Sequence, residues 1–218
     1  MVRGVHTARM KVTYGSAKLG ETLGVQWLTY NPLIFWFFHE AAAASAPVVA
    51  DTFERVFPDA RWFIDIGAGS GAYAAELQAR GRSVCVLEHS RLGRLFARRQ
   101  GVAARPFDLA NNQPDPRHVG RSNVGYCFEV AEHLPPKLGD RLVEFTAAVA
   151  ETVVFTAAQP GQRGVGHVNE QPPDYWIRRF RQQGMRHRAD LQERVASGFA
   201  GAQADWLARN VLVFDSEA

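Results

Sequence analysis

The sequence predicts an α/β domain in which parallel strands alternate with helices. Three features of residues 61–88 predict it: an apolar run rich in strand formers, a turn with alternating glycines, and a helix that leads to a second apolar run. Such a βαβ unit puts the glycine turn at the carboxyl end of a parallel strand, where open α/β sheets bind ligands. The turn is therefore the centre of the predicted site.

The elements of this first unit follow from local composition. Residues 62–66 (W-F-I-D-I) predict a strand, and the glycines of residues 67–71 end it, because neither a strand nor a helix interior favours them. Residues 72–80 consist of good helix formers, and Gly81 stops the helix. Residues 83–87 then predict the second strand.

Two acidic residues beside the turn indicate the ligand. Glu88 ends the second strand, within reach of both ribose hydroxyls of a nucleoside. The residues Gly67, Gly69 and Ala72 also satisfy the dinucleotide pattern G-x-G-x-x-A, which alone is a weak signal. Asp65 precedes the first glycine by two residues and would repel a pyrophosphate. This carboxylate favours the ammonium and sulfonium charges of S-adenosylmethionine.

The later elements are expected in the same alternating order. The chain predicts strands at residues 102–107, 124–128, 152–156, 186–191 and 210–214, and helices at residues 91–100, 136–150, 174–183 and 192–199. Ser90 is the expected N-cap of the first of these helices. The glycine-rich and proline-rich loop of residues 158–173 is long for a compact domain, and loops of this length are usually functional or disordered.

Four motifs occur in one order along the chain: D-I-G-A-G-S-G at 65–71, Glu88, F-D-L at 107–109 and F-E-V-A-E-H-L at 128–134. With them the sequence resembles the class I S-adenosylmethionine-dependent methyltransferases, and the tail from residue 153 to 177 resembles their bacterial small-molecule members. The resemblance implies a Rossmann-like sheet whose last strand inserts antiparallel between the fifth and sixth. It also implies methyl transfer to an O, N or C atom of a small metabolite.

The resemblance carries over to individual residues that would bind the cofactor. These are Asp65, Gly67, Ala68, Gly69, Gly71, Glu88, Asp108, Leu109 and Glu129. Asp108 would accept a hydrogen bond from the adenine amino group, with Leu109 packed on the ring. The alternative for Asp108 is an Asx turn before Asn111 and Asn112. The backbone of Glu129 would border the methionine end of the cofactor.

Two histidines are candidate catalytic residues, because methyl transfer needs aligned reactants and sometimes a proton acceptor. His133 follows the fourth strand, and Glu132 is placed to orient its ring; the alternative is a structural or cofactor-shaping role. His167 lies in the long loop with Glu170 close by. No metal site is predicted, since two groups in one loop lack a third ligand.

The N-terminal part differs from the rest. Residues 33–38 (L-I-F-W-F-F) and the alanines after them predict a helix, in a helical cap of residues 1–46 before a Rossmann-like domain of residues 47–218. Its aromatic face is expected to cover the substrate pocket, or else to pack on the sheet or on a second subunit in a homodimer. His39, Glu40 and Pro47 interrupt the apolar run, so no membrane span is expected.

Composition sets few limits on function. The 25 basic and 22 acidic residues of the 218 nearly balance, which neither requires nor excludes an anionic partner. The two cysteines fall in apolar strands, as buried thiols of a cytoplasmic protein would. A nucleic-acid methyltransferase is disfavoured, because N/D-P-P-Y/F is absent after the fourth strand. A NAD-binding oxidoreductase and a non-catalytic nucleoside-binding module remain alternatives.

Overall fold

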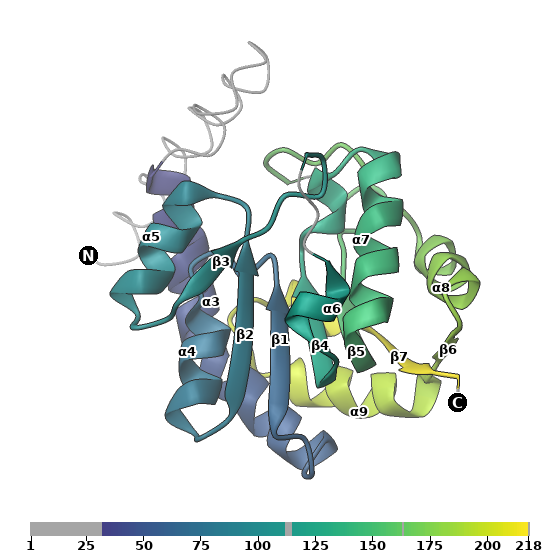
Figure 1. Cartoon of the computed structure of the whole chain (residues 1–218), viewed down its shortest axis with the longest axis horizontal. Helices are drawn as coiled ribbons and strands as arrows, with labels where there is room; N and C mark the ends of the chain where they lie inside the picture. The colour runs from purple at the N-terminus through teal and green to yellow at the C-terminus, as the bar shows by residue number, and fades with distance from the viewer. Residues whose placement is uncertain (1–31, 112–114, 163, 218) are drawn as a thin grey trace.

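The computed structural model describes residues 32–111, 115–162 and 164–217. In this part of the chain a seven-stranded sheet lies between layers of helices (Figure 1). Its strands, in the spatial order β3-β2-β1-β4-β5-β7-β6, are β1 (Trp62–Ile66), β2 (Ser83–Glu88), β3 (Ala104–Pro106), β4 (Ser122–Phe128), β5 (Ala150–Thr156), β6 (Met185–His187) and β7 (Leu212–Ser216). Strand β7 pairs antiparallel with both β5 and β6, whereas the other pairs are parallel. This topology confirms the predicted fold class, including the inserted last strand.

Helices cover both faces of the sheet. They are α3 (Pro32–Val56), α4 (Ala72–Ala79), α5 (Arg91–Arg99), α6 (Pro116–Val119), α7 (Pro136–Val149), α8 (Pro173–Gln182), α9 (Ala189–Phe199) and α10 (Trp206–Asn210), with a 3-10 turn at Ala131–His133. Figure 1 shows α3, α4 and α5 on one side and α6, α7 and α8 on the other. The order of strands reverses between β1 and β4, which is where such sheets bind ligands.

Aromatic side chains fill both helix–sheet layers. On one face Phe53 of α3 stacks on Phe63 of β1, with ring centroids 5.8 Å apart. On the other face Phe180 of α8 stacks on Phe214 of β7 at 4.2 Å. All four side chains are fully buried, and each contributes an apolar burial of about 1.5–3 kcal/mol. The sheet is thus held rigidly, which fixes the loops at the carboxyl ends of its strands.

Helix α3 runs without a break from Pro32 to Val56, with Pro47 inside it. It crosses the expected domain boundary between residues 46 and 47, and residues 1–31 of the expected cap lie outside the described residues. By length and composition alone α3 is able to cross a membrane. Its buried residues are concentrated from Ala41 onward, however, and this half packs against α4 and α9.

The structure corrects two expectations near the C-terminus. Strand β6 ends at His187 and not at residue 191, because α9 begins at Ala189 with Asp190 in its first turn, where a negative charge favours the helix dipole. The last strand begins at Leu212, because residues 206–210 form the short helix α10, which the sequence reading missed. Asn210 therefore ends a helix and does not begin a strand.

Candidate cofactor and acceptor site

The glycine turn has the backbone that its sequence predicts. Gly67, Gly69 and Gly71 have φ angles of 76°, 54° and 72°, a left-handed region that residues with a Cβ rarely adopt. The amides of Gly67 and Ala68 donate to the carbonyl of Leu87 at 2.9 and 3.0 Å, so the turn is tied to the end of β2. Helix α4 begins directly after Gly71 and has no side-chain cap, which leaves its first amides facing the turn.

The three glycines serve different purposes. A Cβ on Gly67 would come within 2.4 Å of Val130, and one on Gly71 within 3.0 Å of Ala97, so both positions need glycine for packing. A Cβ on Gly69 would meet no atom of the described residues within 4 Å. The backbone of Gly69 is therefore open to a ligand, as the predicted close approach of a nucleoside requires.

Glu88 faces the glycine turn. Its Oε2 accepts a hydrogen bond from the Gly69 amide at 2.7 Å, and its Oε1 accepts one from the Ser90 amide. Gly93 makes room for it, since a Cβ there would lie 2.8 Å from Glu88 Cγ. Burial raises the pKa of Glu88, and the two amides partly offset this. Each carboxylate oxygen has a second lone pair, so Glu88 is still able to accept from two ribose hydroxyls.

Asp65 is buried beneath the turn. Its Oδ2 is fully enclosed and has no hydrogen-bond partner among the described residues. Burial raises the pKa of Asp65 well above its ordinary value; the neighbouring Tyr126 hydroxyl lowers it and the charge of Glu88 raises it. An enclosed carboxylate with an unpartnered oxygen is an unusual arrangement, and a cationic ligand group beside it would relieve its cost.

Asp108 forms the Asx turn that was the alternative prediction for this residue. Asp108 Oδ1 accepts from the amides of Ala110 and Asn111 at 2.9 and 3.1 Å, as in an Asx turn, and these bonds with the Asn111 side chain lower its pKa. Leu109 is buried in the core cluster beside Phe107. Contacts of these two residues with adenine remain a prediction.

Glu129 is distinguished by its backbone. Among the described residues it is the one non-glycine residue with a positive φ, 54°, a strained conformation of the kind that clusters at functional sites. Its amide donates to Thr156 Oγ1 at 3.0 Å, and its carboxylate accepts from Asn210 Nδ2 at 3.1 Å. Sequence reasoning missed Asn210, which comes from α10 some 80 positions away in the chain; no local pattern near residue 129 points to it.

Glu132 and His133 lie in the turn after β4, but Glu132 does not orient the His133 ring as predicted. The expected orientation of the His133 ring by Glu132 is wrong, because His133 Nδ1 lies 3.2 Å from the carbonyl oxygen of Gly166. Glu132 instead accepts from the Ala158 amide at 3.3 Å through Oε1. Burial lowers the pKa of His133 to about 4, with the charge of His167 lowering it further, so the ring is neutral at neutral pH.

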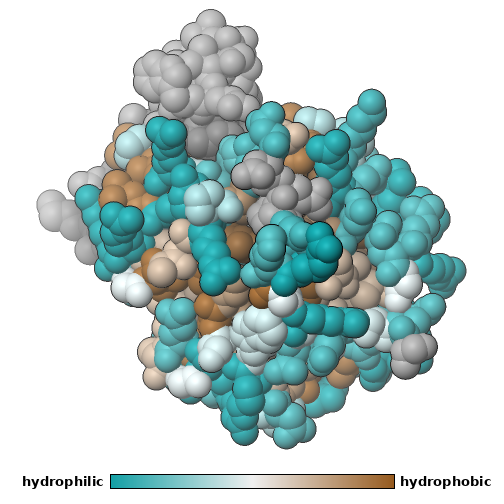
Figure 2. Space-filling view, viewed as in Figure 1, coloured by the Kyte–Doolittle hydropathy of each residue, from teal (hydrophilic) through white to brown (hydrophobic). Residues whose placement is uncertain are grey.

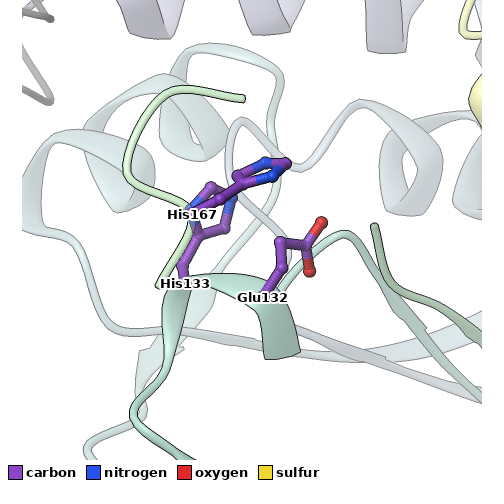
Figure 3. Close-up of side chains that lie close together, drawn as sticks. All are labelled: Glu132, His133 and His167. Atoms are coloured by element: carbon purple, nitrogen blue, oxygen red, sulfur yellow. The ribbon is translucent and has the colours of Figure 1, made fainter. Parts of the chain in front are cut away.

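The long loop after β5 is anchored on this turn. The amides of Val168 and Asn169 donate to the carbonyl of Glu132 at 2.8 and 3.0 Å. His167 is thereby brought next to His133, with ring centroids 5.0 Å apart, and its Nδ1 lies 2.8 Å from Glu170 Oε1. The two predicted catalytic histidines, 34 positions apart in sequence, thus share one site (Figure 3).

The N-terminal helix reaches the glycine turn from the other side. His39 Nδ1 lies 3.0 Å from Ser70 Oγ, and the rings of Trp36 and His39 pack on Phe96 of α5. Helix α3 therefore borders the glycine turn, and its role as a cap stays a prediction. Leu33 and Trp36 nonetheless remain 58% and 54% exposed.

Comparison with solved structures identifies the fold. An amino pentose methyltransferase of Micromonospora echinaspora, CalS10, in its S-adenosylmethionine-bound form superposes with a TM-score of 0.62 at 14% identity, covering 86% of this chain and 98% of the other. An O-methyltransferase family protein of Burkholderia thailandensis gives 0.66 at 16% identity over 97% and 70%. The magnesium protoporphyrin IX methyltransferase of Synechocystis, with S-adenosylhomocysteine bound, gives 0.59 at 14% over 81% and 83%.

No protein family model and no curated protein matches the sequence. The sheet order, the antiparallel β7 and the structural similarity nevertheless agree. The chain has the fold of the class I S-adenosylmethionine-dependent methyltransferases.

Proposed function

We propose that this protein is a methyltransferase that transfers a methyl group from S-adenosylmethionine to a small-molecule metabolite. The observation that carries the proposal is the hydrogen bond of 2.7 Å between the Glu88 carboxylate and the open backbone of Gly69, with Asp65 buried near the end of the strand that leads into the turn. In this donor, the ribose hydroxyls would donate to Glu88, the adenosyl group would lie against Gly69, and the positive charges would be favoured by the carboxylate of Asp65. Solved proteins with the same fold bind the donor or its demethylated product, which supports the choice.

In this proposal one edge of the sheet holds the cofactor. The residues assigned to it are Asp65, Gly67, Ala68, Gly69, Gly71, Glu88, Asp108, Leu109 and the backbone of Glu129. The left-handed turn of Glu129 and its anchoring on Thr156 support its place at the methionine end. When bound, the cofactor supplies a sulfonium-bound methyl group that an electron-rich atom displaces without protonation of the leaving thioether.

His133 and His167 are assigned to the acceptor side. They follow β4 and β5, beyond the glycine turn, and lie together at the carboxyl edge of the sheet. An acceptor hydroxyl or amine must lose a proton during transfer. The imidazole rings of His133 and His167, with Glu170 hydrogen-bonded to His167, are the groups that we assign to accept this proton. The chain itself therefore supplies alignment of the two reactants and help with one proton.

The acceptor is proposed to be a small biosynthetic metabolite in the cytoplasm. The solved proteins of this fold include enzymes named for amino sugars, for protoporphyrin and for mitomycin, which are small molecules of very different shape. The exposed apolar residues at the start of α3 favour either a cap over such a substrate or a homodimer contact.

Parallel calorimetric titrations test the proposal. We expect S-adenosylmethionine and S-adenosylhomocysteine to bind at one site per chain, and NADH and a single-stranded RNA oligonucleotide not to bind. A mixture of hydroxyl-bearing and amine-bearing metabolites should then give products heavier by one methylene. Saturable binding of NADH without binding of either sulfur cofactor would instead favour the oxidoreductase. Donor binding without turnover of any acceptor would favour the non-catalytic module.

A further inference from the structure

Three side chains on the acceptor side have the composition of a metal site. Glu132 and His133 come from the turn after β4, and His167 comes from the loop after β5. One potential ligand atom from each lies within 4.8 Å of the others, and Figure 3 shows the three side chains gathered in one place. The sequence did not predict this site because its third ligand, His167, lies 34 positions after His133 in the chain.

Both histidines are held from behind through Nδ1. His133 Nδ1 contacts the carbonyl oxygen of Gly166, and His167 Nδ1 contacts the Glu170 carboxylate. A neutral imidazole that donates through Nδ1 has its lone pair on Nε2, the atom that then ligates a metal. A Cβ on Gly164 would lie 2.1 Å from His167 Nε2, so only a glycine lets the loop backbone pass this close to the ring.

Glu132 supplies the second, independent observation. The residue is fully buried, and its Oε2 has no hydrogen-bond partner among the described residues. A buried carboxylate oxygen without a donor is costly unless a cation or a proton compensates for it.

We propose that Glu132, His133 and His167 bind one divalent transition-metal ion, of which Zn²⁺ is the representative. Two imidazoles and one carboxylate are a ligand set used by catalytic zinc, and they leave at least one coordination position open. Ligand atoms about 2.1 Å from a tetrahedral ion are about 3.4 Å apart, so the three side chains need only small rotations to close on it.

The role of this ion rests on the proposed methyl transfer. The open position takes an oxygen of the acceptor, which makes the substrate class a hydroxyl compound, best a diol or catechol able to chelate. The ion lowers the pKa of the bound hydroxyl, whose proton leaves to water. The oxygen then forms its bond to the methyl carbon as the carbon–sulfur bond breaks, and a neutral thioether leaves. With the ion bound, the two histidines would therefore help with the proton as ligands of the ion, and would not accept the proton themselves.

Metal binding is measured on untagged, chelator-treated protein. We expect Zn²⁺ to bind with a stoichiometry of one per chain, and Co²⁺ in its place to give visible absorption bands with nitrogen and oxygen ligation. His167→Ala should weaken Zn²⁺ binding at least 100-fold, and Glu132→Gln should do the same if it folds. His187→Ala is the matched control, because His187 lies on β6 and contacts Gln192.

The readouts separate this inference from the methyltransferase proposal. S-adenosylhomocysteine should bind the metal-free protein and His167→Ala with unchanged affinity, since its site lies at the glycine turn. Only millimolar Zn²⁺ binding, or equal affinity in wild type and His167→Ala, would overturn the metal site while leaving the donor site standing. If the wild-type protein does not bind S-adenosylhomocysteine, the proposed methyl transfer is excluded, and with it the role of the metal in that reaction.

Discussion

Glu88 Oε2 lies 2.7 Å from the amide nitrogen of Gly69, so the end of β2 and the turn after β1 form one unit. The bond explains why a buried carboxylate is tolerated here: two backbone amides hold it, one from the turn and one from Ser90. It also places the Glu88 carboxylate, which we propose binds the ribose, beside the Gly69 backbone, where a Cβ would meet no atom of the described residues within 4 Å.

Glu88→Gln should weaken binding of S-adenosylhomocysteine by about 10- to 100-fold, because hydrogen bonds to a charged group contribute roughly 1.5–3 kcal/mol. The NH₂ group that replaces one oxygen also faces a backbone N–H, and two donors cannot hydrogen-bond to each other. Calorimetry measures the affinity. Glu151→Gln is the control, since Glu151 is exposed at the start of β5, away from the turn. Equal affinities in the two variants would exclude Glu88 from the cofactor site.

Gly69→Ala should abolish cofactor binding while the protein stays folded. The new Cβ meets no protein atom within 4 Å, but it fills the space that the nucleoside uses and sits at a φ of 54°. Gly184→Ala is matched to it, with a φ of 73° and equally open surroundings. Both should lose about 1–2 kcal/mol in urea unfolding, the usual cost of a left-handed residue with a Cβ. Retention of affinity in Gly69→Ala would contradict a close approach of the ligand to this turn.

Asp65→Asn should stabilise the protein without ligand at neutral pH. Burial raises the folded-state pKa of Asp65 above its ordinary value of 3.8, so the folded protein binds the proton more tightly than the unfolded chain. The contribution of Asp65 to stability is therefore full below pH 3.8 and declines as pH rises toward the folded-state pKa. The advantage of the variant over wild type should grow with pH in urea titrations above pH 4. An advantage that is constant with pH would mean that the folded-state pKa is not raised.

The same variant should distinguish the two sulfur cofactors. S-adenosylmethionine carries a sulfonium charge that S-adenosylhomocysteine lacks, and a carboxylate near this charge favours the former. Asp65→Asn is thus expected to weaken S-adenosylmethionine binding several-fold more than S-adenosylhomocysteine binding in calorimetry. Equal weakening would show that Asp65 does not act on the methyl-bearing sulfur. A more stable and less active variant is a common outcome at functional sites.

The exposed start of α3 makes the homodimer testable. Leu33, Trp36 and Leu95 are 58%, 54% and 44% exposed, and Figure 2 shows apolar surface over the region of α3 and α5. Replacing Leu33 and Trp36 by serine should convert a dimer into a monomer in sedimentation velocity. A wild type that sediments as a monomer at micromolar concentration would leave the cap as the role of this surface. In that case the same variant should raise KM for the acceptor.

The sheet and the glycine turn with Glu88 beside it were predictable from sequence because their signals are local. The glycines, Glu88 and the N-cap Ser90 lie next to the strands and helices that they end or begin, and the Ser90 hydroxyl does accept from Gly93 at 3.2 Å. The short helix α10 was missed because its five residues carry too little periodicity to register. Its last residue, Asn210, consequently had no predicted role.

The acceptor side was predictable only in its parts. His133 and His167 were each singled out, but their proximity depends on two amides of the long loop that donate to the Glu132 carbonyl. Hydrogen bonds between backbone groups do not depend on side-chain identity, so the sequence does not reveal them. The buried, unpartnered Oε2 of Glu132 was equally hidden, since an acidic residue beside a histidine reads as a surface pair until its burial is known.

A crystal structure with S-adenosylhomocysteine would show where the adenosyl group binds. We expect both ribose hydroxyls to lie within about 3.2 Å of the Glu88 carboxylate, with the adenosyl group over the backbone of Gly69. An adenosyl group bound elsewhere, or a Glu88 carboxylate turned away from the sugar, would contradict it.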